Sequence, residues 1–317
     1  MSDVVHVVNG SSTADTLGEA ELPGDIVVWA DCLDQGPLLP GPDEAYRSAR
    51  AGFLAGFGER ERDAVLGELA SWDAAVDRAV QEADEVVLWY EHDLFCQLAL
   101  VRLLSRMIAR PRKATLSMVS IDHHPELPDF KGLGELDSSQ LAGLWPRRTP
   151  IGGEGLDEAA AAWTALTAPD PRGVAYLARR ARALPFLGAA LSRWLEDLPA
   201  VGTGLTRTEA ELLRAVHKGA ATVPAAMAEV YTSDRIYLMT DVVVAQTSRA
   251  LAAIGALSAP FGTDGAPALT PLGEDLWKGR RDRVTELGID TWQGGVHLSG
   301  HGPVWRWDGG PRRPIFV

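Results

Sequence analysis

The stretch VVLWYEHDLFCQLALVRLL (86–104) decides the fold. It begins as an apolar run rich in β-branched residues, as in a buried strand, and continues with apolar residues at helical spacing. Glu91, His92 and Asp93 lie at the changeover. The pattern therefore predicts a strand that leads directly into a helix, with three titratable side chains at the junction.

Three further apolar runs predict strands at 4–8 (VVHVV), 25–31 (DIVVWAD) and 114–122 (ATLSMVSID). Helical spacing predicts helices over about 43–83 and 93–107. Because strands that alternate with helices indicate βαβ units, we expect a Rossmann-like, mostly parallel α/β domain over residues 1–135. Right-handed crossovers place the carboxyl ends of such strands on one edge of the sheet.

The rest of the chain is predicted to be mainly helical. Stretches rich in Ala, Leu and Arg indicate a helical connecting region over 136–203, and 204–317 has the outline of a winged-helix-like domain. Within it, Thr206 stands three residues before Glu209, which is capping-box spacing at a helix start. The Trp-rich tail predicts two short strands around a Gly-rich turn.

Composition excludes several classes of protein. Hydrophobic residues make up 46% and charged residues 23% of the 317 residues, as in a globular protein. The sequence contains no run of about 18 apolar residues and no signal-peptide pattern, so we expect no membrane partner and a cytoplasmic location. Cys32 and Cys96, the only cysteines, indicate free thiols in a reducing compartment.

Charge disfavours nucleic acid as a partner. The formal net charge is −13, which repels a polyanion. Short basic runs occur at 106–113 and 278–283, but runs of this length are typical of solvated faces or helix ends. A small molecule is therefore the favoured partner.

The candidate site consists of the residues that follow the four predicted strands, because ligands of open α/β sheets bind beyond the carboxyl ends of the strands. General acid/base chemistry is predicted for Asp31, Glu91, His92 and Asp93, since an imidazole can move a proton that a carboxylate orients. The candidate ligand-binding residues at the same edge are Asn9, Gly10, Ser11, Ser12, Gln97, Asp122 and His123.

The acidic residues at this edge also have structural interpretations. Asp93 suits the N-cap of the helix that follows it, and Asp122 suits a loop cap. Glu91 would then point to solvent. What raises the prediction of a site above these alternatives is that polar residues converge from several strand ends.

A phosphate-binding turn is a further interpretation of NGSST (9–13). A glycine, free N–H groups at a helix start and hydroxyl groups all suit an anion. The motif is neither GxGxxG nor a Walker sequence, so plain capping of the helix by Ser12 or Thr13 is favoured.

A zinc site is the last alternative at this edge. His92 and Cys96 are four residues apart, and Cys32 or His123 would complete the ligand set. No CxxC or HExxH pattern accompanies them, and Cys96 suits a buried, small apolar position. We therefore assign no metal ligand, and the sequence identifies no cofactor.

Several segments together resemble a bacterial family known as domain of unknown function eighteen-thirty-five. The segments are HVVNGSS (6–12), VVWADCLDQGP (27–37), VVLWYEHDLFCQLALVRLL (86–104), FKGLGELDSSQL (130–141), AWTALTAPDP (162–171), LPFLGAALSRWLEDLP (184–199) and GLTRTEAELL (204–213). The resemblance implies a single architecture and no activity, because none is assigned to the family. Ser11 and Cys96 depart from the family's pattern, which is acidic at both positions. The positions to which the resemblance directs attention are His6, Asn9, Asp31, Gly36, Pro37, Glu91, His92, Asp93 and Gln97.

Two functions fit these observations. In the first, the N-terminal domain binds a small phosphorylated or nucleotide-like ligand at the strand-end cleft and acts on it as a hydrolase or transferase by general acid/base chemistry. In the second, the protein is a non-catalytic regulator whose winged-helix-like region contacts DNA or a protein partner. We favour the first function, because the chain is acidic and polar side chains gather at the strand ends.

Overall fold

The computed structural model describes residues 3–57, 60–263 and 265–317. A five-stranded sheet has the strand order β2-β1-β4-β5-β6. Its strands are β1 (Val4–Val8), β2 (Asp25–Val28), β4 (Glu85–Trp89), β5 (Thr115–Val119) and β6 (Thr149–Pro150). The first four are parallel to one another, and β6 pairs antiparallel with β5. The mostly parallel α/β sheet predicted from the sequence is confirmed.

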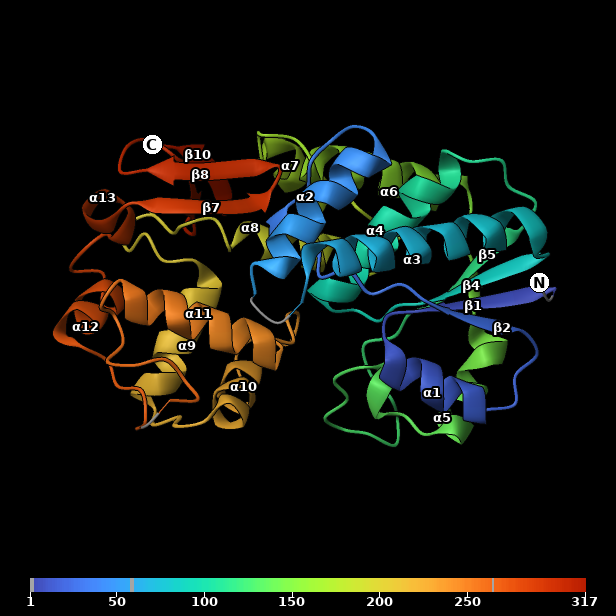
Figure 1. Cartoon of the computed structure of the whole chain (residues 1–317), viewed down its shortest axis with the longest axis horizontal. Coiled ribbons are helices and arrows are strands. Elements are labelled where there is room, and N and C mark those ends of the chain that lie inside the picture. Colours follow the sequence, from blue (N-terminus) through green and yellow to red (C-terminus); the bar gives the residue numbers. More distant parts are fainter. Residues whose placement is uncertain (1–2, 58–59, 264) are drawn as a thin grey trace.

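Helices cover both faces of this sheet (Figure 1). On one face lie α1 (Ser11–Glu19) and α5 (Ser138–Leu144), and on the other lie α3 (Arg62–Glu82), α4 (Leu94–Ile108) and α6 (Gly153–Leu166). Consecutive residues of β4 point to opposite faces, so Val87 and Trp89 join the core under α1 and α5, while Val86 and Leu88 join the other core. Because both faces are covered, β4 is apolar from Val86 to Trp89, and only its first residue, Glu85, is charged.

The predicted helix over 43–83 is two helices, α2 (Asp43–Ala55) and α3. An ion-pair network ties them to α4. Arg106 is 2.7 Å from Asp43, 2.9 Å from Asp73 and 2.6 Å from Asp77. Arg110 also pairs with Asp43 and Asp77. These arginines belong to the basic run at 106–113, so that run stabilises the fold through ion pairs between helices.

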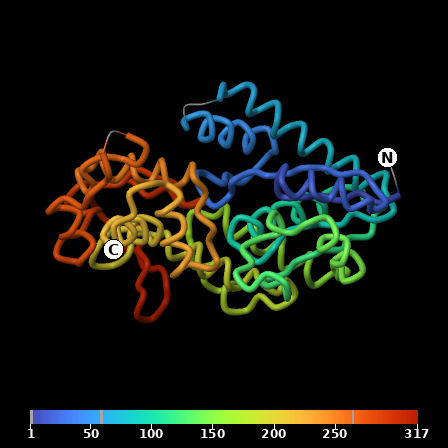
Figure 2. The backbone as a smooth tube through the Cα atoms, turned by 90° about the horizontal axis from the view of Figure 1, so that it is seen from below, coloured from blue at the N-terminus to red at the C-terminus, as the bar shows by residue number. Residues whose placement is uncertain are grey.

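The remaining helices lie mostly in the C-terminal half. They are η1 (Leu133–Glu135), η2 (Trp145–Arg147), α7 (Arg172–Ala178), α8 (Leu187–Leu195), α9 (Arg207–His217), α10 (Val223–Tyr231), α11 (Asp241–Ala253), α12 (Pro271–Trp277) and α13 (Arg283–Leu287). The predicted capping box is present, since the Thr206 side chain accepts from Glu209 N and the Glu209 side chain accepts from Thr206 N. In Figure 2, the N-terminal segments occupy one end of the long axis and the C-terminal segments the other.

The C-terminal strands form two antiparallel hairpins. They are β7 (Ile289–Gly294) with β8 (Val296–Gly300), and β9 (Trp305–Asp308) with β10 (Arg313–Phe316). A two-residue strand, β3 (Gly36–Pro37), pairs parallel with β7 and joins the two halves of the chain. Gly36 has a φ of 76°, and a Cβ there would lie 2.5 Å from the Phe53 ring, so the position requires glycine.

Residues on both sides of position 135 build the sheet and its layers, because α5, β6 and α6 follow that position in sequence. The division into 1–135, 136–203 and 204–317 stays a prediction. Among the described residues, no helix has both the length and the apolar character that a bilayer crossing requires.

Candidate functional site

The chain changes direction across the sheet at β1. It passes from β1 to β2 on one side and later to β4 on the other. At such a switch point the loops after the two adjacent strands diverge and leave a crevice at their carboxyl ends. Asn9 directly follows β1, and Glu91 lies two residues beyond the end of β4. The topology thus places two of the predicted residues where an open sheet favours a ligand.

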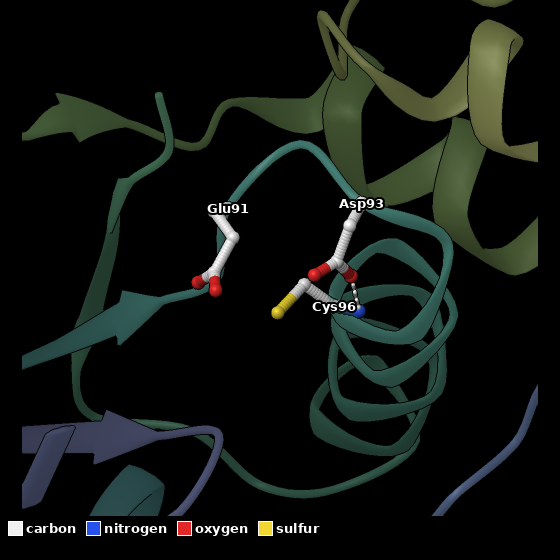
Figure 3. A group of neighbouring side chains, drawn as sticks. All are labelled: Glu91, Asp93 and Cys96. Carbon is white, nitrogen blue, oxygen red and sulfur yellow. Dashed lines mark hydrogen bonds between the residues drawn. The ribbon is translucent and has the colours of Figure 1, made fainter. Parts of the chain in front are cut away.

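Asn9, Glu91, Asp93 and Cys96 form one group, which we call the Glu91 cluster. Asn9 Nδ2 donates to both Glu91 carboxylate oxygens at 3.3 and 3.2 Å, and its distance to Cys96 Sγ is 3.0 Å. Asp93 is the N-cap of α4, and its Oδ1 accepts from Cys96 N at 2.7 Å. Figure 3 shows the polar atoms of Glu91, Asp93 and Cys96 turned toward one another from the strand end and the first helical turn.

The two carboxyls of the cluster are buried, and no Arg or Lys in the described part of the chain pairs with them. Glu91 and Asp93 are each 4% exposed, and among the described residues no Arg or Lys side chain forms an ion pair with either. Burial raises the pKa of Glu91. Burial also raises the pKa of Asp93, and the neighbouring Glu91 charge raises it further, to about 7. The pair can therefore hold or release a proton near neutral pH.

Residues 129–133, which we call the covering segment, close the cluster. Leu133 N donates to Glu91 Oε1 at 3.3 Å. A Cβ on Gly132 would lie 2.4 Å from the same oxygen, so the absence of a side chain allows the backbone to approach. Phe130 O accepts from Tyr231 Oη at 3.0 Å. The segment therefore links the cluster to α10.

His92 and Gln97 flank the cluster and hold its backbone. His92 Nε2 lies 3.1 Å from Arg235 O, while its buried Nδ1 has no hydrogen-bond partner. Gln97 Nε2 donates to Glu91 O at 2.7 Å, and its buried Oε1 has no partner. These contacts position the strand-to-helix junction, and they direct the His92 ring nitrogen toward the C-terminal half.

Asp31 forms a buried ion pair apart from the Glu91 cluster, and its catalytic role stays a prediction. Its carboxylate accepts from Arg50 Nη2 at 2.7 Å and from Tyr46 Oη at 2.9 Å, and all three side chains are buried. The side chain is thus satisfied within the structure, and among the described residues no hydrogen bond or ion pair joins it to the Glu91 cluster. The sequence shows a carboxylate after a strand but does not show which cation folds against it.

Asp122 and His123 lie at the end of β5, outside the cluster. Asp122 Oδ1 and His123 Nδ1 are 2.7 Å apart, and the two side chains are 51% and 85% exposed. They therefore form an exposed pair.

Ser12 and Thr13 do not cap α1, so the predicted side-chain capping is wrong. The N-cap is Gly10, which has no side chain to accept a hydrogen bond. Thr13 Oγ1 instead donates to Asn9 Oδ1 at 3.1 Å, which turns the Asn9 amide nitrogen toward Glu91. Ser11 and Ser12 are exposed at the helix start.

Glu91, Asp93 and Cys96 are also the residues that could hold a metal ion. One ligand atom from each lies within 4.8 Å of the others, and this is the one such group among the described residues. Two carboxylates and a thiolate suit zinc, and Asn9 could add an oxygen if its amide turned over. The zinc set considered from the sequence is not assembled, because His92 Nε2 faces Arg235 O instead.

A cavity of about 730 Å³ lies beside the covering segment, and we call it the Tyr231 cavity. Its apolar part includes Met227, Tyr231 and Met239. Two cations lie over the Tyr231 ring: Lys131 Nζ is 5.5 Å and Arg235 Cζ 4.4 Å from its centroid. Sequence reasoning missed this cavity, because its walls come from segments about a hundred residues apart.

The sequence matches no family model, and no curated protein matches it. The resemblance to domain of unknown function eighteen-thirty-five stays a prediction.

Proposed function

We propose that the protein binds a small phosphorylated or nucleotide-like ligand at the carboxyl edge of its sheet and acts on it by proton transfer. The observation that carries the proposal is the pair of buried carboxyls, Glu91 and Asp93, with no Arg or Lys pairing with them among the described residues. A buried acid pair of this kind destabilises the folded state when both carboxyls are ionised. Groups with strongly raised pKa values concentrate at functional sites.

The Tyr231 cavity supports a ligand with both a ring and an anionic group. Met227, Tyr231 and Met239 offer an apolar surface for a ring, and Lys131 and Arg235 offer charge for a phosphate. Lys131 is adjacent in sequence to Gly132, which contacts Glu91. The covering segment therefore lines the cavity through Asp129 and Lys131 and approaches the cluster through Gly132 and Leu133.

Asp93 suits the role of the group that exchanges a proton with the ligand, because its pKa of about 7 leaves both protonation states populated at neutral pH. Glu91 would be the second carboxyl of the pair, and hydrogen bonds from Asn9 Nδ2 and Leu133 N orient it. Contact with the ligand requires the covering segment to separate from the cluster, which breaks the Leu133 N to Glu91 hydrogen bond. The corresponding reaction class is hydrolysis or group transfer.

The binding step is tested by isothermal titration calorimetry with AMP, ADP, ribose 5-phosphate and inorganic phosphate. We expect at least one organic phosphate to bind, and the double variant Lys131→Ala, Arg235→Ala to lose at least tenfold in affinity. Lys113→Ala is the matched control, since Lys113 is an exposed cation elsewhere on the surface. Equal affinity in the double variant and the control would place the ligand elsewhere.

The chemical step is tested with Glu91→Gln and Asp93→Asn, which keep the side-chain shapes. For a phosphate that binds, turnover would be followed by phosphorus-31 NMR. We expect either substitution to slow turnover while binding in the Tyr231 cavity persists. Unchanged turnover in both folded variants would exclude proton transfer by the cluster.

For the C-terminal region we propose a winged-helix-like unit that packs against the rest of the chain rather than against DNA. The support is the succession of α9, α10 and α11 followed by a bridge between Leu257 and Leu269. Arg249 is the one basic residue of α11. The regulatory alternative requires salt-dependent duplex binding, with affinity that falls steeply as salt rises. We expect no such binding, and its detection by fluorescence anisotropy would favour the regulator.

A further inference from the structure

A second cavity, of about 340 Å³, lies where three parts of the chain meet. We call it the junction cavity. Asp34 and Phe53 approach it from the N-terminal half, Glu209 from α9, Gln246 from α11 and Trp292 from β7. Cavities between packed parts of a protein are frequent ligand sites. Neither the Glu91 cluster nor the covering segment lines it.

One wall of the junction cavity is acidic. Asp197 has a partner there, since Arg193 Nη1 lies 2.7 Å from its Oδ2. Asp34 accepts a hydrogen bond from Tyr237 Oη at 2.7 Å, but no Arg or Lys among the described residues forms an ion pair with it. Burial raises the pKa values of Asp34 and Glu209, and the Asp197 charge adds to both shifts, while the charges of Arg50 at Asp34 and of Arg283 at Glu209 oppose them. A cation in the cavity would therefore be stabilised.

Two hydrogen-bond donors of the same cavity lack an acceptor. Gln246 Nε2 and Arg283 Nε are buried without a hydrogen-bond partner. Arg283 Nε lies 3.5 Å from Glu209 Oε1, which is an ion-pair distance without hydrogen-bond geometry. Each donor can turn to an acceptor in the cavity without giving up a hydrogen bond, and a buried donor gains from doing so.

From this arrangement we propose that the junction cavity binds a small molecule that carries both an ammonium group and an acceptor oxygen, the chemistry of free amino acids and amino alcohols. The ammonium group pairs with Asp34, and the oxygen accepts from Arg283 and Gln246. Phe53 and Trp292 bound the carbon skeleton. The volume lies near the lower end of small-molecule pockets, as such a ligand requires.

The experiment is a binding screen on the full chain, by thermal unfolding and calorimetry, with the free L-amino acids and ethanolamine. Putrescine carries ammonium groups without an acceptor oxygen, and glycerol carries oxygens without an ammonium group. We expect at least one amino acid or ethanolamine to bind one-to-one and raise the Tm, and putrescine and glycerol to bind at least tenfold more weakly.

Two variants locate the binding. Asp34→Asn should weaken the ligand at least tenfold, whereas Asp157→Asn, at an exposed aspartate of α6, should not change its affinity. Gln246→Leu is a second test, at a partly exposed position of α11. If Asp34→Asn fails to fold, this variant alone tests whether the junction cavity is the binding site. It should weaken the amino acid or ethanolamine and leave the weak putrescine binding unchanged. The proposal is overturned if no screened compound binds in the millimolar range, if putrescine or glycerol binds equally well, or if both variants keep full affinity.

Discussion

The ends of β2 and β4 present two solutions to the burial of a carboxylate at one edge of one sheet. After β2, the Asp31 carboxylate is held by the buried Arg50 guanidinium and by Tyr46 Oη. After β4, Glu91 and Asp93 are buried beside each other, and their hydrogen bonds come from neutral groups such as Asn9. The first charge is compensated within the fold, while the second pair is not.

This difference separates structural acids from candidate functional ones better than their position in the sequence does. A buried charge is tolerated in the fold only as long as its partner remains, because loss of the partner leaves the charge uncompensated. An unpaired acid pair is relieved by a proton, a cation or a ligand donor, so it responds to the solution. The two strand ends should therefore differ in how mutation and pH affect them, and four predictions test that contrast.

The largest effect is expected at the end of β2. Arg50→Met leaves the Asp31 charge buried and removes the donors to Cys32 O and Gln35 O, so we expect a loss of about 3–5 kcal/mol of stability. The urea midpoint measures this loss. Arg62→Ala, in an exposed ion pair, should cost less than about 1 kcal/mol. If Arg50→Met also cost less than about 1 kcal/mol, the proposed contrast between the ends of β2 and β4 would be wrong.

The second effect is a pH dependence that arises from Asp93. Because its folded pKa, about 7, lies above the ordinary value of 3.8, the folded state holds an extra proton between those pH values. This contribution to stability is complete below about pH 4 and is lost as pH rises through about 7, by about 4 kcal/mol in all. Urea midpoints at intervals from pH 4 to pH 8 measure the slope.

Asp93→Asn tests the source of that slope, since asparagine also caps helices well. We expect the variant to have a shallower decline between pH 4 and 7, with the remaining slope coming from the other buried acids whose pKa values are raised, Glu91, Asp34 and Glu209. Asp137→Asn, at the N-cap of α5, should keep the wild-type slope. An unchanged slope in Asp93→Asn would assign the pH dependence to other groups.

The third effect concerns the covering segment. Gly132→Ala forces a methyl group against Glu91 Oε1, so we expect a loss of about 1–3 kcal/mol by overpacking. Gly143→Ala, in α5 with open space around it, should be neutral or stabilising. Adding Glu91→Ala should recover part of the Gly132→Ala loss. Independent, additive losses in the double variant would show that the two residues do not press on each other.

The smallest effect is expected in the reactivity of two thiols, Cys32 after β2 and Cys96 after β4. Burial raises the pKa of Cys32 to about 12 and the pKa of Cys96 well above its ordinary value. We expect both thiols of the folded protein to react slowly with a disulfide reagent at pH 8, and both to react rapidly in urea. Rapid reaction of one folded thiol would reveal a local opening, at β2 for Cys32 or at the cluster for Cys96.

Much of the sheet was predictable, because β1, β4 and β5 are short apolar runs that alternate with helical patterns. The parallel arrangement also predicted that Asn9 and Glu91 lie at one edge of the sheet, whereas the strand order that makes β1 and β4 neighbours is a long-range feature that the sequence pattern does not contain. The capping box at Thr206 was also predictable, since it depends on local spacing alone. These features share one property, which is that neighbouring residues in sequence determine them.

The rest depended on contacts that sequence spacing does not reveal. Arg50 pairs with Asp31, and Gly132 closes over Glu91. Neither contact could be predicted, because no sequence pattern marks Arg50 or Gly132 as the partner. Thr13 bonds Asn9 rather than capping α1, because Gly10 at the N-cap lacks a side chain. Both cavities likewise form only when distant segments pack together.

The pairing of β3 with β7 has a consequence for the synthesis of the chain. Gly36 pairs with Gln293, about 250 residues later, so the ribosome needs roughly 10–50 s between making one partner and the other. During that interval the loop that carries Asp34 and Gln35 lacks its final neighbour, although the strands around it can already pair. The nascent chain therefore exposes an unpaired strand edge at β3 until β7 emerges from the ribosome, and unpaired edges of this kind promote aggregation.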